Sequence, residues 1–293
     1  MRRSRSFGEK CFDSGNVLLM LMLSAITLYP LLYVLFASLS DPALLIKQRG
    51  LLLYPQGFNL SSYKAVLSNP MIGTGYLNTI GYVVFGTALN MIMTVFAAYG
   101  LSRKNVMWRT PILIMIVFTM FFSGGLVPTY LLVQSLGMLD TRWALIVPGA
   151  VSAWNMIVMR TAFQAIPESL EESARMDGAN DGTILFRIVI PLSLPVMAVM
   201  ILFYGVGHWN AWFAANLYLR DRGLFPLQLI LREILIQSET DNMTLGTSFG
   251  DQQQISETIK YATIMIATVP ILFLYPFLQK FFVKGVMIGA IKE

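Results

Sequence analysis

Residues 76–100 read YLNTIGYVVFGTALNMIMTVFAAYG, a run of 25 residues without Asp, Glu, Lys or Arg. A helix needs about 20 residues to cross a hydrocarbon core about 30 Å thick, because each residue advances it by about 1.5 Å. The run is also longer than an ordinary core helix. It therefore predicts a membrane-spanning helix.

Five more apolar stretches of sufficient length flank this run. The whole chain has 13% charged and 56% hydrophobic residues, with a mean hydropathy of +0.63, far from the balance of a soluble protein. We therefore predict an all-α polytopic membrane bundle that forms a single transmembrane domain over 1–293. Its six expected spans are 16–39, 76–100, 111–133, 143–162, 188–208 and 261–283.

Positive charge indicates the orientation of these spans. Lys and Arg collect before the first span and in the short loop after the second, and such clusters mark the cytoplasmic side. Both termini are therefore expected in the cytoplasm. The net charge of +5 is assigned to attraction by anionic membrane lipid rather than by nucleic acid. The basic residues concerned are Arg2, Arg3, Arg5, Lys10, Arg103, Lys104 and Arg109.

Two spans contain helix-breaking residues. Gly124, Gly125 and Pro128 interrupt the third span, and Pro191 and Pro195 interrupt the start of the fifth. A proline by itself predicts a simple kink. Unwound backbone at membrane depth, however, must be buried in protein or line a cavity. Gly124 and Gly125 are therefore candidates for a pathway wall or for an early helix end.

The outer end of the fifth span is rich in aromatic and amide side chains. A belt of Trp and Tyr at the membrane interface is the simpler explanation. Sugar binding would use the same residues, since sugar C–H faces pack on rings and amides bond to hydroxyl groups. The candidate contacts are Trp209, Asn210, Trp212 and Asn216.

The chain lacks the residues that would power transport or catalysis. The central parts of the six spans hold no ionisable residue, which disfavours proton coupling. His208 lies at the outer end of its span and is expected to be an interfacial residue without a catalytic or metal-binding role, and Cys11 is the only cysteine. No Gly-Lys pair exists for a phosphate-binding loop, and no catalytic motif is found. Energy for active transport would therefore come from a partner.

The inner loop at 166–187 is the strongest functional signal. Pro167 suits the first position of a helix, Glu171 and Arg175 are spaced for mutual support, and Gly178 is suited to a left-handed helix end. A second helix should start near Thr183 and run stiffly into the fifth span. Small residues on one face of the first helix predict a docking surface, made by Leu170, Ser173, Ala174 and Asp177.

The loop resembles the EAA motif of permeases in binding-protein-dependent ABC importers. Residues 172–174 read ESA, Gly178 follows after three intervening residues, and after nine more residues 188–191 read IVIP. Ser173 and Ile190 are the two departures from the motif, and both are conservative. The flanking residues, together with 122–130, 209–213 and 281–289, are similar to the carbohydrate-uptake branch. Within it they resemble permeases for oligosaccharides, alginate among them.

The resemblance implies a permease of the bacterial cytoplasmic membrane that works by alternating access. It implies a second homologous permease, an extracytoplasmic binding protein that contacts the outer loops, and two ATPase subunits that use ATP and Mg²⁺, while this chain binds no cofactor. The implied ATPase contacts are Glu172, Ser173, Ala174, Asp177 and Gly178. A permease for peptides or amino acids and an ion-driven carrier stand as alternatives, and the charge-balanced outer loops do not distinguish acidic from neutral sugars.

Overall fold

The computed structural model describes residues 7–48, 50–244, 258–273 and 276, without the side chains of 7 and 237–244. Helices make up nearly all regular structure in this part of the chain, and it contains no strand. The predicted all-α class is thus confirmed. The chain divides into two compact units, Met1–Asn69 with Glu233–Val269 and Pro70–Arg232 with Pro270–Glu293. Each unit is described by itself, and the single domain expected over 1–293 stays a prediction.

The first unit contains the predicted first span and the beginning of the last one, since residues from Pro270 on are counted with the second unit. The α1 helix (Phe7–Ser38) is long and apolar and exposes most of its side chains, as a helix in contact with lipid or another chain would. Tyr33 packs edge-on against Tyr261, with ring centroids 5.8 Å apart. The other helices described here are α2 (Pro42–Lys47), α3 (Ser61–Leu67) and Thr258–Phe273.

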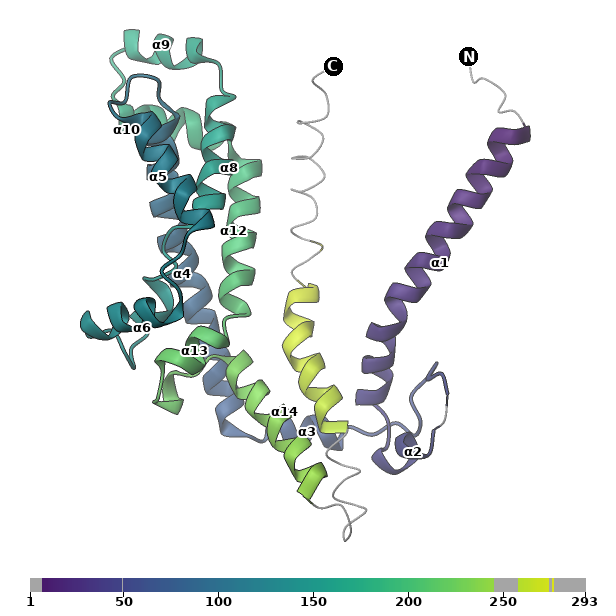
Figure 1. Ribbon diagram of the computed structural model, residues 1–293. Coiled ribbons are helices and arrows are strands. Elements are labelled where there is room, and N and C mark those ends of the chain that lie inside the picture. Colours follow the sequence, from purple (N-terminus) through teal and green to yellow (C-terminus); the bar gives the residue numbers. More distant parts are fainter. Residues whose placement is uncertain (1–6, 49, 245–257, 274–275, 277–293) are drawn as a thin grey trace. The chain divides into compact units, whose positions relative to one another are not determined.

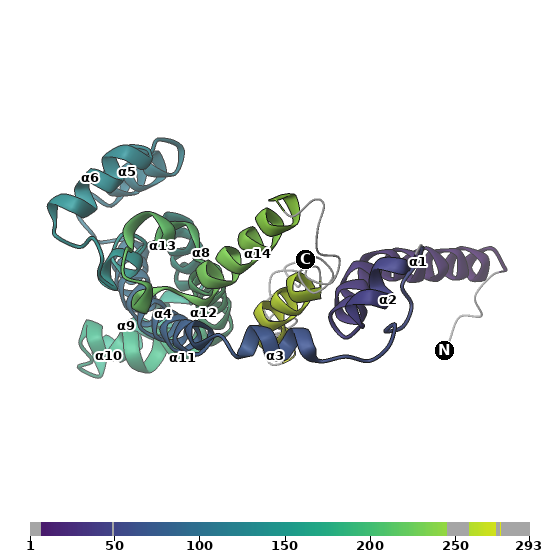
Figure 2. The same ribbon diagram turned by 90° about the horizontal axis from the view of Figure 1, so that it is seen from below.

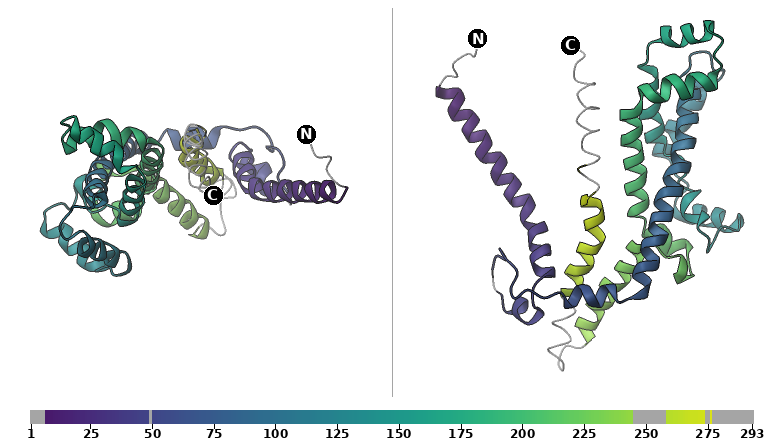
Figure 3. Two further views of the ribbon diagram at one scale, coloured as in Figure 1. Left: turned by 90° about the horizontal axis from the view of Figure 1, so that it is seen from above. Right: turned by 180° about the vertical axis from the view of Figure 1, so that it is seen from behind.

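The second unit is built on three packed helices. The α4 helix (Pro70–Ser102) runs beside α12 (Leu194–Trp209), and α8 (Ala153–Gln164) packs against both (Figures 1 and 3). Their core is apolar at the end near the inner loop. Its fully buried side chains include Met156, Met159, Phe163, Leu185 and Met200.

Shorter elements complete the second unit, and the last of them continues from Glu233 on into the first unit. Seen along the bundle, α5 and α6 lie beside the three helices rather than among them (Figure 2). The α9 helix lies at one end of the bundle and α13 at the other (Figure 1). The bounds are α5 Arg109–Phe121, α6 Leu126–Ser135, α7 Trp143–Ile146, α9 Glu168–Met176, α10 Asp181–Ile184, a π-helical turn Leu185–Val189, α11 Ile190–Leu192, α13 Phe213–Tyr218, a 3-10 turn Arg222–Leu224 and α14 Leu227–Thr244.

The predicted spans differ in how continuous they are. Among the described residues, two helices are long and apolar enough to cross a membrane, and up to four spans result if each of two bent pairs counts as one. The uninterrupted helices are α1 and α4, and they confirm the first two spans. In the sixth, the described helix begins at Thr258 and reaches Phe273, and residues 277–283 lie outside the described part.

Three spans are broken rather than straight, which corrects their predicted bounds. The third ends at Phe121 and restarts at Leu126 with a bend of 114°, and the fifth bends by 84° at Ser193, between its two prolines. A helix ending early, one of the two alternatives for Gly124 and Gly125, is therefore what the third span does. The fourth span divides into α7 and α8 around the nonhelical residues 147–152.

Candidate coupling site

The α9 helix begins and ends as its sequence indicates, with one shift. Pro167 is the residue before the first helical residue, Glu168, so it occupies the N-cap and not the predicted first position. Gly178 has a φ of +82°, the left-handed conformation predicted for it. Its N–H donates to Arg175 O over 3.0 Å, and the N–H of Ala179 donates to Ala174 O over 2.9 Å. These two bonds form a Schellman motif, which stops the helix sharply.

The two faces of α9 have different environments. Glu171 is buried, and Ala174 is half-buried against the core of its own chain. The predicted docking face is therefore narrower than expected, because Ala174 turns inward. The exposed residues available to another protein include Leu170, Glu172, Ser173, Met176 and Asp177.

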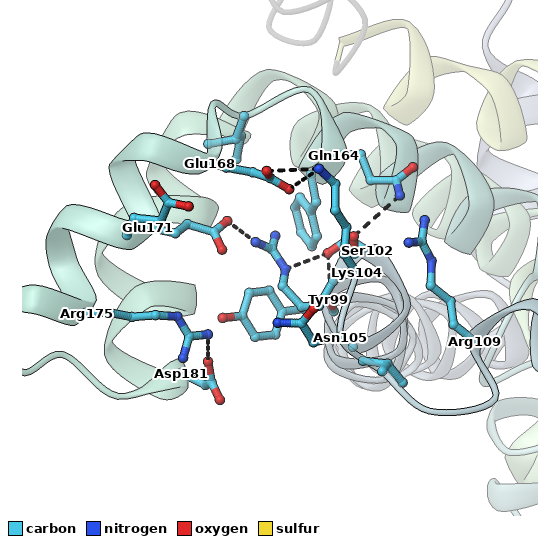
Figure 4. A pocket seen from close by; sticks show the side chains of 16 residues that line it. Tyr99, Ser102, Lys104, Asn105, Arg109, Gln164, Glu168, Glu171, Arg175 and Asp181 are labelled. Atoms are coloured by element: carbon cyan, nitrogen blue, oxygen red, sulfur yellow. Dashed lines mark hydrogen bonds and ion pairs between the residues drawn. The ribbon is translucent and has the colours of Figure 1, made fainter.

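Ion pairs attach α9 to its surroundings (Figure 4). The predicted support between Glu171 and Arg175, one turn apart, is not among the ion pairs of the described residues. Each of these two side chains has a partner outside α9 instead. The three pairs are Arg103 with Glu171, Lys104 with Glu168 at 2.7 Å, and Arg175 with Asp181 at 2.5 Å.

These pairs differ in exposure, and therefore in strength. The side chains of Arg103 and Glu171 are 19% and 10% exposed, whereas those of Lys104 and Glu168 are 73% and 60% exposed. Water screens the second pair far more than the first. The Arg103 guanidinium also lies 4.6 Å from the ring centroid of Tyr99. The Arg103–Glu171 pair is therefore the firm link between α9 and the end of α4.

A charged pocket of about 760 Å³ lies between α9 and the end of α4. Figure 4 shows residues of both elements pointing into it. Its lining includes basic and acidic side chains in similar number, and Glu172 is one of them. The predicted coupling residue therefore borders a polar recess at the end of the bundle.

The link from α9 to α12 is helical but not straight. Asn180 caps α10, its side chain accepting from the N–H of Thr183 over 2.8 Å, so the second helix starts at Asp181, slightly before the expected position. The helix continues through the π-helical turn to Leu192, and the chain then bends at Ser193. The predicted stiff connection is therefore a helical segment with one bend.

The predicted sugar contacts at the other end of the bundle lie in different environments. Trp209 is 9% exposed and packs against Tyr76 with ring centroids 6.3 Å apart, so it acts mainly in packing. Trp212 is exposed, and the Arg232 guanidinium lies 4.4 Å from its ring centroid. Asn210 and Asn216 are exposed. Gly124 and Gly125 are exposed at the bend between α5 and α6 and are not brought together with these residues.

Sequence reasoning missed the polar residues inside the bundle. His208, expected at the interface, is half-buried and bonds to Asn90 of α4 at 2.7 Å. Asn78, also on α4, donates to the carbonyl oxygens of Gly223 and Phe225 and so holds the 3-10 turn. The available signal was the presence of two Asn in a charge-free helix, since a buried amide needs partners.

Comparisons with known proteins agree on one kind of protein. Residues 105–288 match the family described as binding-protein-dependent transport system inner membrane component. The chain is 43% identical to the polygalacturonan/rhamnogalacturonan transport system permease protein YtcP of Bacillus subtilis, over 97% of this chain and 99% of that protein. It is 42% identical to the protein LplC of the same species, over 97% and 95% of the two chains.

A solved structure has the same fold. It is a chain from the crystal structure of a bacterial ABC transporter involved in the import of the acidic polysaccharide alginate. The TM-score is 0.85 at 34% identity, and the match covers 95% of this chain and 99% of that chain. The chain therefore has a fold already known from a transport protein.

Proposed function

Because the chain belongs to the family of binding-protein-dependent transport system inner membrane components, we propose that it admits acidic oligosaccharides through the membrane. It is a permease subunit of an ABC transporter, not an enzyme. The cargo that we propose is chains of uronic acids, with pectic and alginate fragments as the leading examples.

The observation that carries this cargo is the agreement of a sequence similarity with a structural one. One relative is named for polygalacturonan and rhamnogalacturonan, and the structural match imports alginate. Polygalacturonan and alginate differ in their sugars but share a carboxylate on each unit. Shared chemistry between two cargoes supports a pathway shaped for uronate chains more than one shaped for a single sugar.

The inner loop supports a partnership with ATPase subunits. The exposed residues of α9 include Glu172, Ser173 and Asp177. They lie at the end of the bundle, where the rest of the second unit does not bury them. The proposed contacts are these three residues with Gly178, while Ala174 supports the helix from behind. Two ATPase subunits would bind ATP and Mg²⁺, and this chain would bind neither.

The proposed assembly has further members. A second homologous permease would complete the pathway, and an extracytoplasmic binding protein would deliver sugar at the first and last outer loops. With the inner loop on the ATPase side, both termini lie in the cytoplasm, in agreement with the basic residues before α1. Closing of the ATPase pair would move α9, and the helical segment Asp181–Leu192 would transmit that motion to α12.

Uptake assays test the cargo. The complete complex is reconstituted in vesicles with its binding protein and offered oligogalacturonate, alginate oligomers or a neutral oligosaccharide of equal length. ATP-dependent uptake of the acidic sugars, with little uptake of the neutral one, is expected. Preference for the neutral sugar would refute the uronate assignment. Uptake of peptides or amino acids instead would favour a permease for those solutes. Uptake driven by an ion gradient without ATP would favour an ion-driven carrier.

A double substitution tests the coupling surface. Glu172→Lys reverses a charge on the exposed face of α9, and Gly178→Pro prevents the left-handed turn that ends this helix. The pair should abolish copurification of the ATPase with the permease. Lys104→Ala, which removes only an exposed ion pair next to the same surface, is the matched control and should keep it. Full association in the double variant would refute the assignment.

A further inference from the structure

The nonhelical segment 147–152, which joins α7 to α8, interrupts the predicted fourth span. Pro148 and Gly149 lie in its middle, where both disfavour helix continuation. Irregular backbone within a bilayer leaves peptide groups that lipid cannot bond. The segment therefore needs polar partners on every side.

Its depth follows from its contact with α4. Asn90 donates through its side-chain nitrogen to Gly149 O over 2.5 Å. Asn90 precedes Ser102, the last residue before the basic inner loop, by 12 residues of continuous helix. At about 1.5 Å per residue this separation is about 18 Å, near the middle of a core about 30 Å thick. Gly149 thus lies deep in the membrane.

Two sets of side-chain contacts hold one side of the segment. In the first set, Asn90 joins Gly149 O to His208 Nε2, the latter at 2.7 Å from Asn90 Oδ1. Because the Asn90 nitrogen faces a carbonyl, its oxygen faces the imidazole and accepts the proton of Nε2. Gly86 provides the space for this ring, since a Cβ there would lie 2.5 Å from His208 Nε2.

The second set lies one helical turn away. The Tyr204 hydroxyl shares a hydrogen bond of 2.7 Å with Thr94 and accepts from the N–H of Ser152 over 3.2 Å. Thr94 follows Asn90 by four residues, and Tyr204 precedes His208 by four, so equal spacing on α4 and α12 repeats the arrangement. We call the two sets the paired clamps. They fasten the segment at its middle, through Gly149, and at its last residue, Ser152.

The other side of the segment has no such partners. No described residue donates a hydrogen bond to the carbonyl oxygens of Pro148, Ala150 or Val151. The side chains of Val147 and Val151 are 40% and 43% exposed. Three unbonded acceptors at this depth cannot face hydrocarbon, because each would cost several kcal/mol. They must therefore be covered by polar groups of a neighbouring protein or face a water-filled space.

We propose that Val147–Val151 is a sugar-binding wall of the transport pathway, in which backbone carbonyls accept hydrogen bonds from sugar hydroxyl groups. This proposal rests on the proposed function. The wall offers acceptors and, at Pro148, no N–H, so it suits the hydroxyl face of a uronate chain and not its carboxylates. Asn90 and Tyr204 are positioning residues, since they act on the segment and not on the sugar.

Thiol labelling tests the wall in the complete, reconstituted complex. Cys11 is the only cysteine, so Cys11→Ser supplies a thiol-free permease in one step, and the partner proteins are used without cysteines. Val151→Cys, or Val147→Cys if the first does not assemble, is then labelled with a charged methanethiosulfonate reagent that reacts in water. Ser173→Cys, exposed on α9, is the matched control.

The expected result is labelling of the wall thiol that the cargo suppresses. With oligogalacturonate at about ten times its half-saturating concentration, labelling at Val151→Cys should slow about tenfold, while labelling at Ser173→Cys should not change. Absent labelling, or labelling insensitive to sugar, in a complex that still imports oligogalacturonate overturns the wall and leaves the proposed function intact. If wild-type complex imports no acidic sugar, the proposed function fails first.

Separate substitutions test the positioning role of the paired clamps. Tyr204→Phe removes the hydroxyl that holds Ser152, and Asn90→Leu removes the amide that holds Gly149. Each variant should raise the half-saturating sugar concentration for protection of Val151→Cys severalfold in a complex that still binds the ATPase. Thr119→Val, which removes a hydroxyl on α5 bonded only locally to Ile116 O, is the control and should leave it unchanged. Unchanged protection in both clamp variants would refute their positioning role.

Discussion

Arg103 donates to the carboxylate of Glu171, and this ion pair joins the loop after α4 to the α9 helix. Burial lowers the pKa of Arg103 below its ordinary value, but a guanidinium stays charged at physiological pH. The proposed coupling helix therefore has two routes into the bundle. One runs through Gly178 to α12, and the other runs directly to α4.

Breaking this ion pair should weaken coupling. In Glu171→Gln, Arg103 loses its counter-charge in a site with little water, at a cost of about 3 kcal/mol, the low end for buried pairs because some water reaches Arg103. We expect fewer sugar molecules imported per ATP hydrolysed. Glu168→Gln breaks the exposed neighbouring pair and should change this ratio little, at about 0–1 kcal/mol. Equal ratios in the two variants would count against the direct route to α4.

A side chain at Gly178 should strain the end of α9. Its φ of +82° is unfavourable for any residue with a Cβ, so Gly178→Ala should cost about 1–2 kcal/mol. If the strain misplaces the contact face, affinity for the ATPase falls about tenfold for each 1.4 kcal/mol. Gly182→Ala, where the added Cβ makes only an ordinary contact, is the control in the same binding measurement. Equal affinities would show that the helix end tolerates the change.

A methyl group at Gly86 should displace His208. The ring would have to leave Asn90, because the new Cβ would lie 2.5 Å from its Nε2. Thermal unfolding of the purified permease should show a lower Tm for Gly86→Ala. Gly81→Ala on the same helix meets no atom within 4 Å and should hold or raise the Tm, since Ala favours a helix by up to about 1 kcal/mol over Gly. A Tm for Gly86→Ala as high as that of Gly81→Ala would contradict the close packing.

Acid should release the turn after α13. The Asp140 carboxylate accepts from the backbone N–H groups of Asp221 and Arg220, each at 2.8 Å, and these bonds lower the pKa of Asp140 below its ordinary 3.8. A carboxyl group with a lowered pKa stabilises the fold above its ordinary pKa, and that contribution is lost as pH falls through the folded value.

Hydrogen exchange at the two backbone amides would measure this release. Their protection, corrected for the intrinsic pH dependence of exchange, should be constant from neutral pH to about pH 4 and fall in stronger acid. In Asp140→Asn, which keeps an acceptor oxygen but does not ionise, the fall should disappear. The same fall in both proteins would exclude Asp140 as its cause.

Helical segments and the inner loop could be predicted because their signals are local. Charge-free length alone indicates a span such as α4, and the left-handed turn at Gly178 follows from the one residue type without a Cβ. The positions of the bends could be predicted, but their angles could not. The glycines and prolines mark where the third and fifth spans change direction, but the angles of 114° and 84° depend on what each half packs against.

The ion pairs and the paired clamps could not be predicted, because their partners are far apart in the chain. Glu171 is one turn from Arg175, which favours a local pair, yet Arg103 is its partner once α4 and α9 meet. Likewise His208 looks like an interfacial residue until α12 packs beside α4 and brings it to Asn90.

By itself the sequence determined that the chain is a helical membrane protein of the permease kind, because hydropathy, charge and motif spacing are properties of consecutive residues. Only the tertiary structure decided which face of α9 is free and where the fourth span unwinds. It also showed which polar groups hold the unwound backbone in place. Those outcomes depend on satisfying buried charges and peptide groups, and the atoms that satisfy them come from separate helices.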